Sequence, residues 1–398
     1  MSKKKKIEQE EQAIYDELAE FAGGEVLGKQ NSVKYLVDTG SLALNYVCSG
    51  KFIEGGIPGG RITEIFGEES SSKSLVGTNV LYGCQKLGGY AIILDCENTM
   101  NKEFAQNASH LNVNKVLIYH PASLERAFKK IHTVVNFIRE RDKNAPIVVV
   151  YDSITVSPCE RELREIDLAE EYSEAEFKRV VGAKEQPGER AKVCSRELRK
   201  ITPFLHENNV TLLVINQTRS KIGVMFGDPT TTGGGGKALP FYASLRLKTA
   251  AAKNIVRKIE GTKLETPIGV NINVTNKKNK IFTPYIGTKG LQLFFNNGMN
   301  PVTGLLTLLL QCKRVLPAGT GRFSVAPEYL PEGMEEYKFQ SSIDRNDVPS
   351  KVLTDCPKLV DANTSDEVCS YLNTFGDAIS QSSAEDIFEN NLDADAEE

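Results

Sequence analysis

The segment Gly67-Glu68-Glu69-Ser70-Ser71-Ser72-Lys73-Ser74 most constrains what this chain can fold into. It follows a short run of β-forming residues and precedes a helical pattern, about 73–87, that ends at two glycines. Strand, small polar loop and helix form the context of a phosphate-binding P-loop, in which backbone N–H groups surround a triphosphate. Lys73 would then reach the outer phosphates of ATP, and the Ser74 hydroxyl would bind Mg²⁺.

One position of this loop departs from the P-loop motif GxxxxGK[ST]. Ser72 stands where the motif has its second glycine. A serine adds a Cβ where the backbone approaches phosphate, so we expect it to shift the loop geometry or slow turnover. An ordinary polar turn can have the same composition, so the rest of the chain must decide between the two.

Strand-like and helix-like segments alternate from Ser41 to Gln217, within a core expected to span residues 39–300. Near-continuous apolar strands separated by helices are typical of a mostly parallel sheet covered on both faces, so the expected fold is α/β. Ser41 is expected to cap the first helix of this core. The expected strands are 90–95, 115–119, 145–153 and 211–217, and the expected helices are 42–47, 124–141 and 193–208.

Three of the expected strands lead into polar side chains, Glu97, Asp152 and Gln217. Ligands collect at the carboxyl ends of parallel strands. Asp152 is predicted to hold Mg²⁺ directly or through water, and Glu97 to orient or deprotonate an attacking water. Gln217 is predicted to sense the γ-phosphate. Each residue alone could be a strand-end cap or turn former, but together beside the loop they indicate an ATP and Mg²⁺ site.

A glycine-rich segment, 218–237, follows Gln217 directly. A loop of this length with little structure of its own is usually functional or disordered. Cations beside exposed apolar side chains suit single-stranded DNA, because cations meet phosphates while apolar groups insert between bases. The cations are Arg219, Lys221 and Lys237, and the apolar side chains are Ile222, Met225 and Phe226.

The two ends of the chain differ from its centre. Residues 1–38 begin with lysines and continue as an amphipathic pattern too short for a core, which predicts a helical arm that packs on the body of the chain or on a neighbouring subunit. We assign this arm to oligomerisation. Residues 301–380 are predicted to form a small C-terminal domain, and residues 381–398 an acidic disordered tail. From Leu359 to Glu398 there are 11 acidic residues and no Lys or Arg, so the net charge of −4 becomes +7 for residues 1–358. A basic body with an acidic tail suits a polyanion binder, and a purely solubilising tail would look the same.

The sequence lacks the features that are typical of membrane and secreted proteins. No stretch approaches the ~20 apolar residues of a membrane span, and the N-terminus has no apolar signal-peptide centre. The eight cysteines are scattered, with no C-x-x-C pair, which argues against a zinc site or a disulfide framework. We therefore expect a cytoplasmic protein with no membrane partner.

Several runs resemble the bacterial RecA recombinase family. They are 221–227 (KIGVMFG), 229–234 (PTTTGG), 241–244 (FYAS), 67–71 (GEESS) and 278–281 (KNKI). The resemblance extends from about Thr39 to Gly304. It implies a RecA-type P-loop ATPase core and a DNA-dependent ATPase that forms helical filaments on single-stranded DNA, pairs it with a homologous duplex and exchanges strands in recombination and repair. Single-strand-binding and mediator proteins would be further partners.

The same resemblance implies roles for individual residues. Glu97 would be the catalytic glutamate, and Gln217 would couple ATP to a second DNA-binding loop, 218–237. Phe104 would stack on adenine. Lys278 and Lys280 would reach the γ-phosphate of a neighbouring subunit, so that only a filament hydrolyses ATP. Phe241 would lie at the subunit interface, and Arg199 would contact DNA.

Other features of the chain depart from the family. Pro240 replaces a lysine beside Phe241, and the first DNA-binding loop, within 158–190, is longer than in the family, with ten acidic and six basic residues. Its DNA contacts therefore do not transfer. Two other functions remain open: an ATP-gated DNA-binding filament with weak or no hydrolysis, and a RecA-core helicase or repair accessory ATPase.

Overall fold

The computed structural model describes residues 3–24, 26, 33–107, 109–164, 188–220, 230–232, 236–259, 264–282, 287–342 and 346–380. The chain divides into two compact units, Met1–Lys34 and Tyr35–Glu398. The first unit contains α1, Lys3–Ala22. Ile14, Tyr15, Leu18 and Phe21 of this helix are all exposed. The predicted N-terminal helix is therefore present, and its role in oligomerisation stays a prediction.

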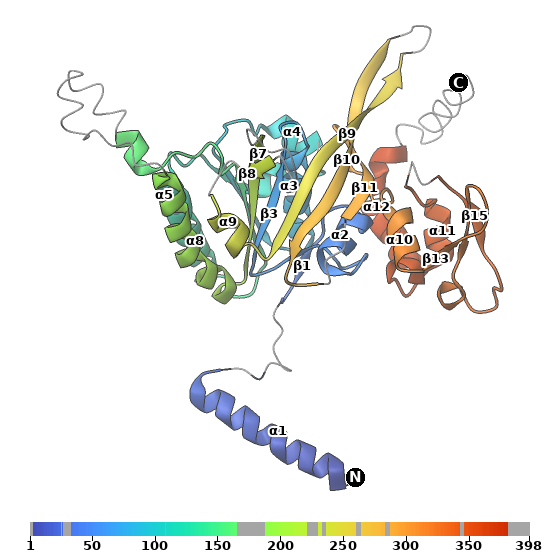
Figure 1. Ribbon diagram of the computed structural model, residues 1–398, viewed down its shortest axis with the longest axis horizontal. Helices are drawn as coiled ribbons and strands as arrows, with labels where there is room; N and C mark the ends of the chain where they lie inside the picture. The colour runs from blue at the N-terminus through green and yellow to red at the C-terminus, as the bar shows by residue number, and fades with distance from the viewer. Residues whose placement is uncertain are drawn as a thin grey trace. The chain divides into compact units, whose positions relative to one another are not determined.

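Ten described strands form the main sheet of the second unit, in the order β12-β11-β10-β9-β3-β7-β6-β4-β5, with β8 paired to β7 (Figure 1). From β9 to β5 neighbouring strands run parallel, whereas β10, β11 and β12 extend the sheet antiparallel. The predicted α/β fold with a mostly parallel sheet is confirmed. The strands are β3 (Ile62–Gly67), β4 (Tyr90–Asp95), β5 (Val116–Tyr119), β6 (Ile147–Asp152), β7 (Val210–Ser220), β8 (Thr230–Thr232), β9 (Leu245–Lys258), β10 (Glu265–Asn279), β11 (Gly287–Phe294) and β12 (Gly298–Met299).

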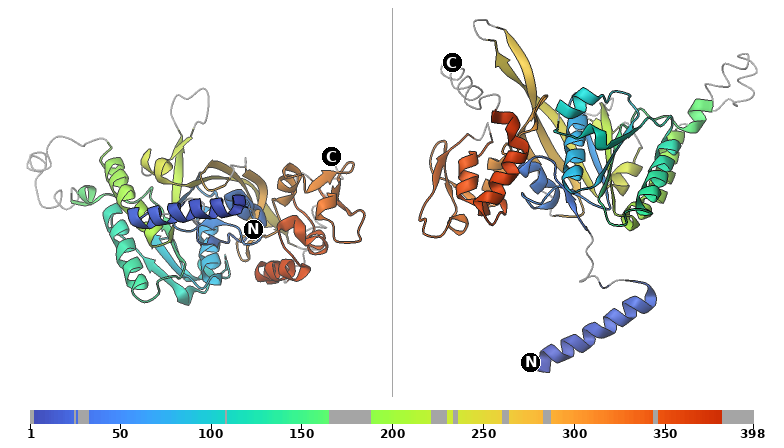
Figure 2. Two further views of the ribbon diagram at one scale, coloured as in Figure 1. Left: turned by 90° about the horizontal axis from the view of Figure 1, so that it is seen from below. Right: turned by 180° about the vertical axis from the view of Figure 1, so that it is seen from behind.

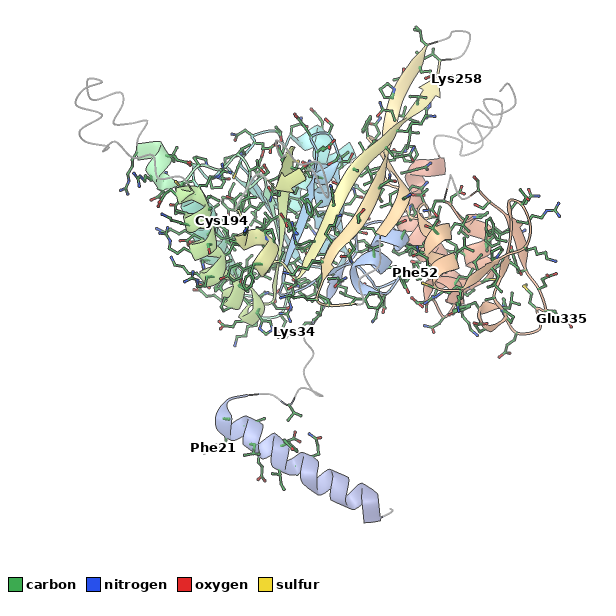
Figure 3. The ribbon with its side chains drawn as sticks, in the orientation of Figure 1. Phe21, Lys34, Phe52, Cys194, Lys258 and Glu335 are labelled. Atoms are coloured by element: carbon green, nitrogen blue, oxygen red, sulfur yellow. The ribbon has the colours of Figure 1, made fainter. Side chains whose placement is uncertain are left out.

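Helices cover both faces of the sheet, as the two views of Figure 2 show. One hydrophobic core contains Phe52 and lies on the side of α2 and α3. The other contains Cys194 and lies on the side of α5 and α8 (Figure 3). Because β6 is buried along its whole length, its near-continuous apolar sequence matches its place between the two layers. The core helices are α2 (Leu42–Ser49), α3 (Lys73–Lys86), α4 (Lys102–Asn107), α5 (Leu124–Arg139), α8 (Glu189–Glu207) and α9 (Ala238–Tyr242).

The predicted elements of the core are present with small shifts in their bounds. The Ser41 hydroxyl accepts a hydrogen bond from the Leu44 backbone N–H, as expected of an N-cap. The helix expected from 193 begins earlier, at Glu189, and the strand expected over 211–217 extends to Ser220. Short pieces complete this part: β1 (Leu36–Val37), β2 (Ile57–Pro58) and the 3₁₀ turn η2 (Val113–Lys115).

The C-terminal residues pack on the core within the same compact unit. The buried Tyr371 hydroxyl donates to Asp38 Oδ1 at 2.9 Å, and the Arg314 guanidinium lies 5.0 Å from the centre of the Phe52 ring. The predicted domain boundary after residue 300 stays a prediction, and residues 381–398 lie outside the described residues. The elements are α10 (Leu305–Gln311), β13 (Val315–Pro317), β14 (Arg322–Val325), η3 (Pro327–Tyr329), β15 (Lys338–Gln340), α11 (Ser350–Asp355), η4 (Pro357–Val360) and α12 (Ser365–Ser380).

The helices of the described residues were also compared with the requirements of a membrane span. None of them combines the length and the apolar character that crossing a bilayer requires.

Candidate ATP-binding site

A cavity of about 520 Å³ lies at the carboxyl ends of β3, β4, β6 and β7. Its volume falls within the roughly 300–1,000 Å³ of small-molecule pockets. The loop after β3 supplies one wall, and polar side chains from the ends of three other parallel strands supply another. The lining residues are Glu69, Ser70, Ser71, Ser72, Lys73, Ser74, Leu75, Glu97, Asp152, Ile215, Gln217, Ala251, Asn254, Val270 and Phe295.

The loop is tied to β9 at its beginning. Gly67 is buried, and a Cβ at this position would lie only 2.3 Å from the Thr249 carbonyl oxygen, so only glycine fits. Ser71 Oγ donates to the Glu68 carbonyl at 2.7 Å and lies 3.0 Å from Thr249 Oγ1. Glu68, Glu69 and Ser70, in the middle of the loop, are exposed to solvent.

Ser72, the departure from the P-loop motif, adopts a left-handed backbone with φ 60° and ψ 25°. Glycine enters this region without steric cost, whereas a residue with a Cβ loses roughly 1–2 kcal/mol there. Ser72 therefore keeps the backbone conformation that a glycine would favour at this position. Its side chain makes no capping hydrogen bond to α3.

Lys73 and Ser74, the first two residues of α3, lie side by side in the cavity. Lys73 Nζ donates to the Glu68 carbonyl at 2.5 Å and to Ser71 Oγ at 3.2 Å. Burial lowers the pKa of Lys73, while the carboxylates of Asp152 and Glu97 oppose that shift. The amine is thus folded back onto its own loop, where backbone N–H groups and a helix N-terminus favour an anion.

Ser74 Oγ donates to Asp152 Oδ2 at 2.6 Å. Burial raises the pKa of Asp152 to about 6; the Ser74 hydrogen bond lowers it, and the neighbouring carboxylate of Glu97 raises it. No group of three or more His, Cys, Asp or Glu side chains in the described ranges could hold a metal. A hydroxyl and one carboxylate nevertheless fit Mg²⁺, which keeps several waters and binds phosphate oxygens beside one or two protein ligands.

Glu97 accepts two hydrogen bonds at the cavity. Ser153 Oγ donates to Glu97 Oε1 at 2.5 Å, and Gln217 Nε2 donates to the same oxygen at 3.1 Å. Among the described residues no donor reaches Oε2, so this oxygen is free to accept a proton from a water. The three predicted strand-end residues, Glu97, Asp152 and Gln217, therefore line one cavity with the P-loop.

One further part of the cavity lining was not predicted from the sequence. Ala251 and Asn254 of β9, Val270 of β10 and Phe295 form it, and Phe295 is 40% exposed. Its backbone N–H donates to the Ile268 carbonyl at 3.0 Å, which fixes the residue just after β11. An exposed aromatic ring in an ATP-sized cavity is suited to stacking on a nucleobase. The only sequence signal was an aromatic pair, Phe294-Phe295, before a turn.

Comparison with known proteins agrees with this geometry. The family model described as RecA N-terminal domain matches residues 11–300. The chain belongs to the RecA family. Protein RecA of Leptospira meyeri is 31% identical over 344 residues, covering 85% of this chain and 80% of the relative. Protein RecA of Thermus aquaticus is 30% identical over 347 residues, covering 86% and 92%, and that of Chloroherpeton thalassium is 32% identical over 303 residues, covering 76% and 75%.

Two lysines that the RecA resemblance assigns to catalysis lie apart from this cavity. Lys278, on β10, donates from Nζ to the carbonyls of Pro240 and Phe241 at 2.7 and 2.8 Å. Burial and the neighbouring Lys280 lower its pKa. Lys280 lines a second cavity, of about 390 Å³, together with Phe241, whose ring is 70% exposed. Neither lysine lines the cavity that contains Glu97.

The residues predicted to bind DNA are only partly described. Arg199 is exposed on α8, and Lys237 is exposed at the start of α9. The backbone of Arg219 belongs to β7, but its side chain lies outside the description, as does that of Phe104 in α4. Lys221, Ile222, Met225 and Phe226 lie wholly outside the described residues, and so does most of the first loop, 165–187. Their roles stay predictions.

Proposed function

We propose that this RecA-family protein is an ATP-dependent DNA recombinase that forms helical filaments on single-stranded DNA, pairs it with a homologous duplex and exchanges strands. The observation that carries the proposal is the 3.1 Å hydrogen bond from Gln217 to Glu97. It joins the expected catalytic carboxylate to the strand that continues into 218–237, the segment predicted to bind DNA. Through this contact, DNA bound at 218–237 would influence the carboxylate that acts in hydrolysis.

The residues of the cavity fit a Mg²⁺-bound triphosphate. Lys73 and the backbone of the loop would hold phosphates, while Ser74 and Asp152 would bind Mg²⁺, which neutralises charge during phosphoryl transfer. Glu97 would take a proton from the attacking water through Oε2. Ser153 and Gln217 hold the other oxygen of the carboxylate and so orient it.

Two features of the single chain support filament formation. Lys278, Lys280 and Phe241 gather around β10 and α9, apart from Glu97. This separation suits lysines that act on a neighbouring subunit's ATP, so that hydrolysis depends on assembly. At the other end of the sheet, the edge strand β5 exposes Leu117 and Ile118, each 43% exposed, and an open edge strand is a surface for contacts with another chain.

The test is to measure ATP hydrolysis with and without single-stranded DNA, and then strand exchange between circular single-stranded DNA and a homologous linear duplex. We expect DNA to stimulate hydrolysis at least tenfold and strand exchange to require ATP. Lys73→Ala should abolish nucleotide-dependent DNA binding. Replacing Lys278 and Lys280 together by Ala should spare ATP binding but abolish hydrolysis.

Three other results would contradict the proposal or establish a different function. Hydrolysis indifferent to DNA would contradict the proposal. Nucleotide-dependent filaments without phosphate release would instead establish the ATP-gated filament, and rings that unwind duplex DNA would establish a helicase.

A further inference from the structure

A row of polar side chains crosses the sheet from β9 to the end of β4. It begins at Arg246, which lies opposite Lys278 in the register of β9 and β10. Arg246 Nε donates to Glu64 Oε2 on the next strand, β3. The neighbouring positions of β10, β9, β3 and β7 can be followed in Figure 1.

The row continues without interruption on the other side of Glu64. Asn216 Nδ2, on β7, donates to Glu64 Oε1 at 2.8 Å. Thr155 Oγ1, just beyond β6, donates to Asn216 Oδ1 at 2.9 Å. The Gln217 backbone N–H in turn donates to Thr155 Oγ1 at 3.0 Å. The Gln217 side chain then reaches Glu97, which follows β4.

The central members of this row are shielded from water. Glu64 and Asn216 have no exposed surface, and Thr155 is 4% exposed. In such surroundings a lost hydrogen bond is not replaced by water, so each bond restricts where its partners can lie. Neither Asn216 nor Thr155 lines the ATP cavity. Their hydrogen bonds therefore act on the site through Gln217.

We propose that Asn216 and Thr155 are positioning residues, which hold Gln217 in place against Glu97 and anchor both to the Arg246–Glu64 pair across the sheet. The inference rests on the proposed ATPase function and adds that the catalytic geometry is set by this buried row. Lys278 of β10 lies opposite Arg246, at the β9 end of this row.

Thr155 offers a matched pair of substitutions. Thr155→Val keeps the shape but removes the hydroxyl, whereas Thr155→Ser keeps the hydroxyl. Arg190 donates to the backbone carbonyls of Ile154 and Thr155, so the backbone stays anchored in both variants. Thr211→Val is the control, because Thr211 is an equally buried threonine of β7 whose hydroxyl donates to Tyr35 instead.

We expect Thr155→Val to lower kcat for DNA-stimulated ATP hydrolysis about tenfold, in line with one buried hydrogen bond. KM for ATP and the affinity for a fluorescent ADP should change less than twofold. Thr155→Ser should recover most of the lost kcat, and Thr211→Val should leave kcat within twofold of the original protein. A Thr155→Val enzyme with unchanged kcat, or one whose loss is matched by Thr211→Val, would overturn the inference.

A second measurement does not depend on hydrolysis. Thr155→Val, Asn216→Leu and their combination form a double-mutant cycle in thermal unfolding. The combined shift in Tm should be clearly smaller than the sum of the single shifts, because both changes break the same row. Additive shifts would overturn the inference even if the protein hydrolysed no ATP, which would by itself refute only the proposed function.

Discussion

At the scale of single residues, Ser72 shows how the chain tolerates a departure from the P-loop motif. Its backbone is already left-handed. In Ser72→Gly a steric cost of roughly 1–2 kcal/mol is removed, against an entropic cost of about 0.5–1 kcal/mol for glycine. We expect the free energy of unfolding in urea to rise by about 0.5 kcal/mol and KM for ATP to stay within twofold.

The matched variant is Ser72→Val. A β-branched side chain is a genuine outlier in the left-handed region, so this variant should unfold at lower urea concentration and bind ATP more weakly than Ser72→Gly. Equal stability of the two variants would show that the left-handed conformation is absent in solution.

Asp152 predicts a dependence of stability on pH. Its pKa of about 6 lies above the ordinary value of an aspartate, chiefly because of burial. Between about pH 4 and pH 6 the folded state therefore binds more protons than the unfolded state, and the free energy of unfolding falls as pH rises through this window. Asp152→Asn removes this penalty and should raise that free energy by about 3 kcal/mol at pH 7.5, but by much less at pH 4. Chemical unfolding without Mg²⁺ or nucleotide measures both, and an equal gain at the two pH values would contradict the assignment.

The residues of the site differ in how far the sequence could predict them. Glu97, Asp152 and Gln217 could be found because each lies at or within two residues of the end of an apolar run in the sequence, and parallel strands present their carboxyl ends at one edge. Glu64, Thr155 and Asn216 could not be found, because a polar residue within or just beyond a buried strand gives no sign of its partner on another strand. The Lys278 and Lys280 positions came only from family resemblance.

At the scale of elements, the parallel strands from β3 to β5 were predictable, whereas β9 and the antiparallel strands beyond it were not. Buried strands such as β6 read as continuous apolar runs, whereas β9 and β10 mix buried and exposed residues with bulges in their register. Their pairing with the core depends on contacts distant in sequence. The part of the ATP cavity lined by Val270 and Phe295 therefore could not be predicted from local sequence patterns.

This part of the cavity gives a prediction for Phe295. If its ring stacks on the base of ATP, Phe295→Ala should raise KM for ATP about five- to tenfold, as expected for an aromatic contact of about 1 kcal/mol, and leave kcat within twofold. Phe295→Tyr keeps the ring and should retain the original KM. Steady-state hydrolysis and fluorescent ADP binding measure these effects, and an unchanged KM in Phe295→Ala would place the base elsewhere.

At the scale of the whole molecule, the two compact units have different means of burying apolar surface. The unit from Tyr35 onward has two hydrophobic cores of its own. The described residues of the N-terminal unit form one helix, and a single helix cannot bury its apolar side chains within itself. Phe21 is 92% exposed and Tyr15 62% exposed. Either the body of the chain or a second copy must cover these side chains, and the role of the arm in assembly stays a prediction.

Removing residues 1–34 should therefore separate folding from assembly. We expect the shortened protein to keep its Tm within a few degrees and its affinity for fluorescent ADP, because both cores and the ATP cavity remain. Sedimentation velocity with ATP and single-stranded DNA should show the loss of filaments, and DNA-stimulated hydrolysis should fall with them because Lys278 and Lys280 would lack a neighbour.

In the full chain, Phe21→Ser should weaken assembly by roughly 2 kcal/mol per contact, the scale of one buried aromatic side chain. Glu20→Gln, on the same helix, is the control. Filaments that persist without residues 1–34 would contradict the predicted arm.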